Sequence, residues 1–204
     1  VMHKQGIEMS EKVPCTECGA AILASTAERT GGLCMPCKNG NRKNIEQAKE
    51  FYKRERELDK TCPFRALWRE LVDKAYNQED GFAKLTDDEK LYYAVNVLSG
   101  EVYNGGFNQY FDNSSGEHYR HAELGLMRLG AKHSLSLLRE AKVALFGSAS
   151  VPKDRAERFA ALEKQAEQPS LDGLDDGFYK DPDSLGEKLE DFAVATGLVK
   201  MHNQ

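Results

Sequence analysis

The 204-residue sequence lacks several patterns that would each indicate a particular class of protein. It has no run of about 18 apolar residues, which excludes a membrane-spanning helix. Its 17 glycines are scattered and form no phosphate-binding loop of the Walker or Rossmann type. It has no internal repeat, and its serines lack the context of a nucleophile elbow. With 40% hydrophobic and 30% charged residues, most of the chain is predicted to be soluble and folded.

The polar N-terminus contains no apolar stretch, so we expect no export signal there. We expect residues 1–12 to form a disordered leader. We also predict a cytoplasmic location, where cysteines stay reduced and able to hold a metal. The unpaired Cys62 precedes Pro63 at an expected helix start, and it is interpreted as a small buried residue because no partner base is evident nearby.

The other four cysteines occur as two pairs, Cys15 with Cys18 and Cys34 with Cys37. Two intervening residues let both sulfurs of a pair turn toward one point, and two pairs supply the four thiolates of a tetrahedral zinc site. The spacing between the pairs fits paired zinc knuckles. Two disulfides, a redox-active pair or free thiols are the alternatives. We predict one structural Zn²⁺ in a ribbon- or knuckle-like module at 13–43, since four thiolates leave no open position for catalysis.

Charge is unevenly distributed along the chain. Residues 1–60 carry 11 Lys and Arg against 9 Asp and Glu, whereas the remainder carries 17 against 24. Residues 44–60 alternate acids and bases beside a narrow apolar stripe, which predicts a charged linker helix. Acidity peaks between Asp172 and Asp191. This asymmetry permits a basic partner for the C-terminal part, and an ordinary solvated surface is the alternative. It disfavours binding of nucleic acid by the whole chain.

Helical periodicity runs through residues 61–200, where apolar residues recur every three or four positions. Thr86 and Glu89 have the spacing of a capping box, as do Ser184 and Glu187 before the last expected helix. Strand alternation is not convincing after the cysteine region, although that region permits short strand pairing. The sequence therefore predicts a mainly α protein, with an all-helical bundle domain, a small N-terminal zinc-binding module and a connecting charged helix.

The most distinctive segment of the helical region combines two glycines, an aromatic cluster and polar turn residues. The glycines are expected to end one helix, and Ser114 and Glu117 have capping-box spacing for the next. A joint between helices explains the segment without invoking chemistry. The residues that define it are Asn104, Gly105, Gly106, Phe107, Tyr110, Phe111, Ser114 and Glu117.

This segment resembles the signature of a bacterial family of helical domains of unknown function, typified by a DNA-mimic protein. The later run LDGLDDGFY at 171–179 is similar to the acidic C-terminal element of that family, and the resemblance covers about residues 63–197. It implies an all-helical, non-enzymatic domain that binds a protein partner and is able to form a homodimer. In the DNA-mimic member, carboxylates stand in for phosphates and occupy a DNA-binding protein. The corresponding residues here are Asp172, Asp175, Asp176, Asp181 and Asp183.

Two other functions remain open. In the first, the zinc module reads nucleic acid through phosphate contacts from Arg29, Lys38, Arg42 and Lys43. In the second, the chain is an uncharacterised hydrolase or metalloenzyme centred on His118 and His121. These histidines lie three residues apart on a predicted helix and are able to share a face. The polar residues proposed to line its pocket are Asn104, Asn108, Gln109 and Asn113.

The enzyme alternative has little support in the pattern of residues. No motif supplies a third metal ligand, so packing is the simpler interpretation of the two histidines. Turn bonding and helix caps explain the asparagines. A nucleophile, a base and an oxyanion site do not assemble from any recognisable spacing. The sequence therefore favours a protein without enzymatic activity.

Overall fold

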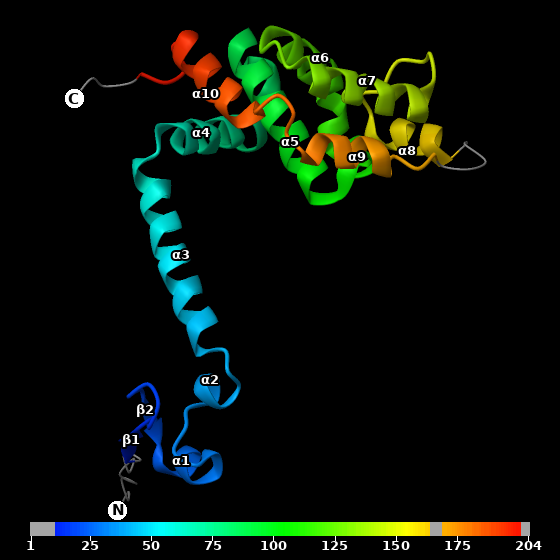
Figure 1. Ribbon diagram of the computed structural model, residues 1–204. Coiled ribbons are helices and arrows are strands. Elements are labelled where there is room, and N and C mark those ends of the chain that lie inside the picture. The colour runs from blue at the N-terminus through cyan, green and yellow to red at the C-terminus, as the bar shows by residue number, and fades with distance from the viewer. Residues whose placement is uncertain (1–10, 164–168, 201–204) are drawn as a thin grey trace, which may run out of the picture. The chain divides into compact units, whose positions relative to one another are not determined.

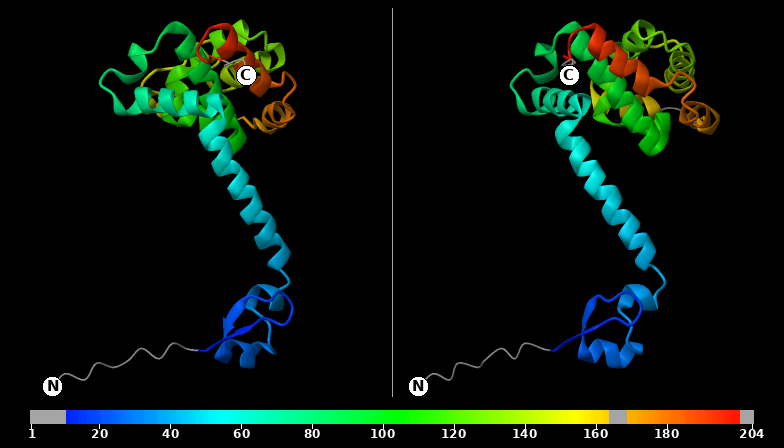
Figure 2. Two further views of the ribbon diagram at one scale, coloured as in Figure 1. Left: turned by 90° about the vertical axis from the view of Figure 1, so that its left-hand side faces the viewer. Right: turned by 60° about the vertical axis from the view of Figure 1, so that its left-hand side comes forward.

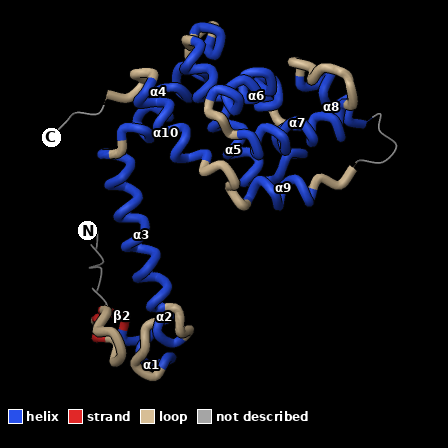
Figure 3. Tube along the Cα trace, turned by 45° about the horizontal axis from the view of Figure 1, so that its top comes forward, coloured by secondary structure: helices blue, strands red, loops and turns tan. Residues whose placement is uncertain are grey.

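The computed structural model describes residues 11–163 and 169–200 (Figure 1). These residues form two compact units, with the boundary between Thr61 and Cys62. Helices make up most of each unit (Figure 3), which confirms the predicted mainly α fold. Most of the predicted leader, residues 1–10, lies outside the described residues. No helix in the described ranges is both long and apolar enough to cross a membrane.

The N-terminal unit begins with a two-stranded antiparallel hairpin in which Lys12 lies opposite Leu23 and Pro14 opposite Ala21. The core beneath this hairpin consists of three buried cysteines with a few half-buried apolar neighbours. So small a core cannot by itself offset the entropy lost when the chain folds. The elements of the unit are β1 (Lys12–Pro14), β2 (Ala21–Leu23), α1 (Ala24–Thr30), α2 (Met35–Lys38) and α3 (Arg42–Thr61).

Helix α3 corresponds to the charged linker helix that was predicted at 44–60. Neither it nor α1 contains a buried residue. Exposed Phe51 and Tyr52 contact each other edge to face, with 5.6 Å between ring centroids. The guanidinium of Arg54 lies 5.7 Å from the centroid of the Phe51 ring. The helix is held by contacts between neighbouring side chains on its own surface.

The C-terminal unit is a bundle with α5 at its centre, as two further views show (Figure 2). Helices α4, α6, α8, α9 and α10 all pack against α5. The buried residues contributed by α5 include Tyr93, Leu98, Phe107 and Phe111. The elements are α4 (Pro63–Asn77), the 3-10 turn η1 (Gly81–Lys84), α5 (Asp87–Asp112), the 3-10 turn η2 (Ser114–His118), α6 (Tyr119–Arg128), α7 (Lys132–Phe146), α8 (Arg155–Glu163), α9 (Asp172–Tyr179) and α10 (Leu185–Ala195).

The capping box predicted at Thr86 is present at the start of α5. The Thr86 hydroxyl accepts a hydrogen bond from the backbone N–H of Glu89 at 3.3 Å. The Glu89 carboxylate accepts one from the backbone N–H of Thr86 at 2.8 Å. Two otherwise unpaired N–H groups of the helix start are thereby satisfied, which explains why α5 begins here.

The other two predicted capping boxes are wrong. Ser184 has φ of 50° and its side chain makes no capping bond; instead the Asp181 carboxylate accepts from the backbone N–H of Leu185 at 2.9 Å. Ser114 opens the 3-10 turn η2, whose N-cap makes no side-chain bond. Helix α6 then starts at Tyr119. The spacing of these residues did not predict the caps correctly, because contacts with other parts of the fold determine the backbone geometry at both positions.

Candidate metal centre and acidic surface

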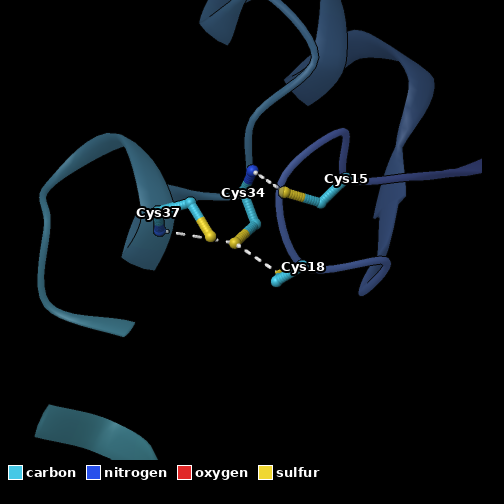
Figure 4. A group of neighbouring side chains, drawn as sticks. All are labelled: Cys15, Cys18, Cys34 and Cys37. Carbon is cyan, nitrogen blue, oxygen red and sulfur yellow. Dashed lines mark hydrogen bonds between the residues drawn. The ribbon is translucent and has the colours of Figure 1, made fainter. Parts of the chain in front are cut away.

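Four sulfurs from two separate segments meet at one point of the N-terminal unit (Figure 4). Cys15 and Cys18 lie in the turn between β1 and β2, Cys34 precedes α2, and Cys37 lies within α2. All four Sγ atoms lie within 4.8 Å of one another. In a tetrahedral site with metal–sulfur bonds of about 2.3 Å, the sulfurs would be roughly 3.8 Å apart. The cluster therefore has nearly the dimensions that a four-thiolate metal site requires.

Backbone N–H groups point at two of these sulfurs. Cys34 donates its backbone N–H to Cys15 Sγ at 3.2 Å, and Cys37 donates to Cys34 Sγ at 3.5 Å. The first knuckle closes through a bond from the Gly19 N–H to the Cys15 carbonyl at 2.9 Å. Gly19 has φ of 72°, which glycine adopts at little cost. Gly19 therefore lets the chain turn tightly around the first cysteine pair.

Arg42 lies directly against the cluster. Its Nη2 donates to Cys18 Sγ at 2.7 Å and to Cys34 Sγ at 3.6 Å. This contact raises the pKa of Arg42 and is one of the causes that lower the pKa of Cys18, after the backbone N–H of Ala20. Because its guanidinium is engaged by sulfur, Arg42 is not placed for the phosphate contact considered above. The other three residues of that set, Arg29, Lys38 and Lys43, are exposed.

Cys15 and Cys37 have pKa values shifted in opposite directions. The backbone N–H of Cys34 is the main cause that lowers the pKa of Cys15 to about 6. Burial, followed by the neighbouring sulfurs, raises the pKa of Cys37 well above its usual value. Four thiolates this close repel one another unless a cation lies between them. In the described ranges, no other group of His, Cys, Asp or Glu side chains is arranged to hold a metal ion.

His118 and His121, considered above as metal ligands, pack against aromatic rings. The buried His118 ring lies 4.1 Å from the Phe82 ring, and the half-buried His121 ring meets the same ring edge-on at 5.0 Å. Burial is the main cause that lowers the pKa of His118, to about 4. The imidazole is therefore neutral at pH 7, and its 3.4 Å contact with Glu117 is not an ion pair.

The glycine pair breaks α5 as predicted. Gly105 and Gly106 have non-helical backbone angles, and Gly106 has φ of 75°. The Asp175 carboxylate, from α9, accepts a hydrogen bond from the backbone N–H of Phe107 at 2.8 Å, which caps the second half of the broken helix. Phe107, Tyr110 and Phe111 are fully buried beyond the break. Asn104 is exposed before it.

The polar residues of the same segment converge on Glu101, which the sequence analysis did not single out. Its Oε2 accepts from Gln109 Nε2 at 2.6 Å and from Asn113 Nδ2 at 2.9 Å, while its Oε1 accepts from Ser115 Oγ at 2.7 Å. Burial opposes the ionisation of Glu101, but these three hydrogen bonds outweigh it and lower its pKa. The one sequence feature that indicates this network is the position of Glu101, an acidic residue one helical turn before the glycines.

Arg158 of α8 was also missed, because a lone arginine in a polar stretch gives no signal. It is fully buried. Its guanidinium donates to backbone carbonyls at and just after the end of α5 and to others just before α8. The acceptors are the carbonyl oxygens of Phe111, Asn113, Ser114, Pro152 and Lys153. A positive charge at the C-terminal end of α5 also complements the helix dipole.

The five aspartates expected to face a partner divide into two groups. Three of them bond to backbone: Asp175 caps the broken helix, Asp181 caps α10, and Asp183 accepts from the backbone N–H of Ser134 at 2.7 Å. Of these, only Asp181 is exposed. Asp172 and Asp176 are exposed on α9, and their side chains make no such bond to backbone within the described part of the chain.

An exposed aromatic pair adjoins these acids. Asp172, Asp176 and Tyr179 are spaced four and three residues apart, so they share one face of α9. The Tyr179 ring stacks on Tyr103 of α5, with 5.8 Å between centroids and 26° between planes. Burial and then the charge of Asp181 raise the pKa of Tyr103. We call the exposed residues Asp172, Asp176, Tyr179, Tyr103 and Asp181 the acidic face.

Comparison with known proteins places the helical unit in a family. The profile described as DMP19-like protein matches residues 83–196, from within η1 to the end of α10. The match includes the glycine break and the acidic face but not the cysteine cluster, and it begins later than the resemblance predicted from residue 63. Comparisons with curated proteins and with solved structures return no match. Because the matched range spans more than half of the sequence, the chain belongs to the family of DMP19-like proteins.

Proposed function

We propose that this chain is a non-enzymatic binding protein whose helical unit engages a basic protein partner, a DNA-binding protein, through the acidic face. The N-terminal unit is folded around one structural zinc ion. Membership of the DMP19-like family supports a binding role for the helical unit. The composition of the acidic face, which combines exposed carboxylates with a stacked tyrosine pair, carries the proposal.

The acidic face suits a basic protein surface for two physical reasons. Exposed tyrosine rings are common anchors of protein interfaces, because they bury large apolar areas at low entropic cost. Tyr103 and Tyr179 are 48% and 43% exposed, so about half of each ring remains to be covered. The adjacent carboxylates of Asp172 and Asp176 would steer and orient arginine and lysine side chains. A protein that normally binds phosphates presents such side chains.

The zinc assignment rests on the donor set. Thiolates are soft ligands, and a tetrahedral arrangement of four favours zinc over magnesium or calcium. Cys15, Cys18, Cys34 and Cys37 would all bind the ion, leaving no position for water. Zinc would therefore supply folding energy to a unit whose apolar core is very small, and it would not take part in catalysis.

The test compares two variants that remove the same charge from different surfaces. The full chain is immobilised, and a DNA-binding protein captured from an extract of the source organism is identified and purified. Binding of that protein is then measured against salt concentration for Asp172→Asn/Asp176→Asn. We expect at least about tenfold weaker binding and a shallower salt dependence, because two partly desolvated ion pairs are lost.

The matched control is Glu187→Gln/Glu190→Gln on α10, where both acids are also exposed. This variant should bind the partner within about twofold of the original chain, because isolated surface charges contribute little. Equal binding by the α9 variant and the original chain would refute the acidic face as the docking surface. Binding of DNA itself by the full chain would point instead to the zinc module.

A further inference from the structure

We propose that a groove between α4 and α5 binds an arginine side chain of the basic partner. This inference rests on the proposed function and adds a second, separate recognition site to it. The groove has a volume of about 480 Å³. Its walls include Trp68 and Tyr76 from α4, Gly100 and Glu101 from α5, and Gln109 beyond the glycine break.

The first feature that points to a cation is the aromatic wall. Trp68 stacks on the buried Tyr93 ring at 5.5 Å, with 28° between the ring planes. Tyr76 lies 6.5 Å from the same ring and is 62% exposed. The packing fixes the orientation of Trp68 and leaves aromatic surface facing the groove. Such surfaces attract guanidinium groups, and tryptophan does so most strongly.

The second feature is the Glu101 carboxylate. It is held by three neutral donors, and no Lys or Arg side chain in the described ranges forms an ion pair with it. Lys74 of α4 is already paired with Glu70 at 2.8 Å and Glu89 at 2.9 Å. The Glu101 carboxylate therefore has no cationic partner among the described residues.

The carboxylate also has room for one more donor. An ionised carboxylate has about four acceptor positions, and three are used at Glu101. Its Oε1 receives only the Ser115 hydroxyl. The side-chain amides of Asn104 and Gln109 line the same groove and offer further carbonyl oxygens. A planar guanidinium is able to stack on an aromatic ring while it donates to oxygens at its edge, which favours arginine over lysine.

The single tryptophan of the sequence makes the groove directly observable. Trp68 fluorescence of the full, metal-loaded chain is titrated with N-acetyl-arginine amide. N-acetyl-citrulline amide, which has nearly the same shape without the charge, is the matched probe. We expect a saturable change with a dissociation constant of roughly 1 to 10 mM for the arginine probe. The citrulline probe should bind at least about tenfold more weakly.

Two variants test the site from different sides. A Cβ atom at Gly100 would meet no atom within 4 Å, so we expect Gly100→Leu to project into the groove with little backbone strain. Glu101→Gln removes the charge and retains the size of the side chain. Each should weaken the arginine probe at least about tenfold, and Gly100→Leu should weaken the captured partner similarly. Glu187→Gln, at an exposed position of α10 that does not line the groove, should change neither.

The outcomes separate this inference from the proposed function. Equal fluorescence responses to the arginine and citrulline probes, or a response that survives Gly100→Leu, would refute the proposal that the groove binds arginine. If the partner complex depends on Asp172 and Asp176 but not on Gly100, the proposed arginine site in the groove is refuted. The proposed role of the acidic face is then retained. If the arginine probe binds but binding of the partner does not depend on Asp172 and Asp176, the proposed role of the acidic face is refuted instead.

Discussion

At the scale of single residues, the helical unit stabilises two buried basic groups in opposite ways. Arg158 keeps its charge because backbone carbonyls accept all of its hydrogen bonds. His118 loses its charge because burial, and then the positive charges of His121 and Arg158, disfavour protonation. Because the buried imidazole is neutral in the folded protein but can be protonated in the unfolded chain, the free energy of unfolding depends on pH.

The first prediction concerns this dependence. The pKa of His118 is about 4 in the folded protein and about 6.5 when exposed. Between these values the unfolded chain binds the extra proton, so the stabilising contribution is complete above pH 6.5 and is lost as pH falls toward 4. We expect the original chain to lose about 2 kcal/mol more than His118→Gln between pH 7.5 and 4.5. Urea unfolding monitored by Trp68 fluorescence measures this difference, and parallel pH profiles would contradict it.

At the scale of elements, the broken helix α5 determines how the signature segment is used. The glycine pair turns the chain, and Asp175 from α9 caps the second half. Phe107 is then directed into the core. The break therefore depends on two elements about 70 residues apart in sequence, and each holds the other in place.

The second prediction concerns Gly106. A Cβ atom at this position would collide with the Asp175 carboxylate, and φ of 75° is unfavourable for any other residue. Gly106→Ala should lower the free energy of unfolding by about 2 to 4 kcal/mol, through backbone strain and the lost cap. Gly173→Ala on exposed α9 is the matched control, since its Cβ atom meets nothing within 4 Å. It should change stability by less than about 1 kcal/mol. Equal effects in urea unfolding would show that the break is not strained.

At the scale of the whole molecule, two units have different sources of stability. The helical unit has an extended apolar core, whereas the N-terminal unit has only the cysteine cluster and a few neighbours. Stability of the first should come from buried apolar surface, and stability of the second from the metal. The two units should therefore respond separately to removal of metal.

The third prediction follows from this difference. The chain should contain one zinc per molecule, and a chelator should remove it and unfold the N-terminal unit. Hydrogen exchange should then become fast at 11–41, while the unfolding midpoint reported by Trp68 changes little. Cys37→Ser should have the same effect, and Cys62→Ser, at the half-buried start of α4, should retain the zinc. A second metal, or a large shift of the Trp68 midpoint on chelation, would contradict this prediction.

Features that depend on local spacing could be predicted from neighbouring residues. Apolar periodicity predicted the helices, the two cysteine pairs predicted the cluster, and Thr86 with Glu89 predicted the start of α5. Contacts between polar groups far apart in sequence became evident from the packed fold alone. Asp175 caps a helix break at Phe107, and Glu101 and Arg158 gather partners from distant turns. Buried polar groups must find partners wherever the packed fold places them, so their pairing cannot be read from neighbouring residues.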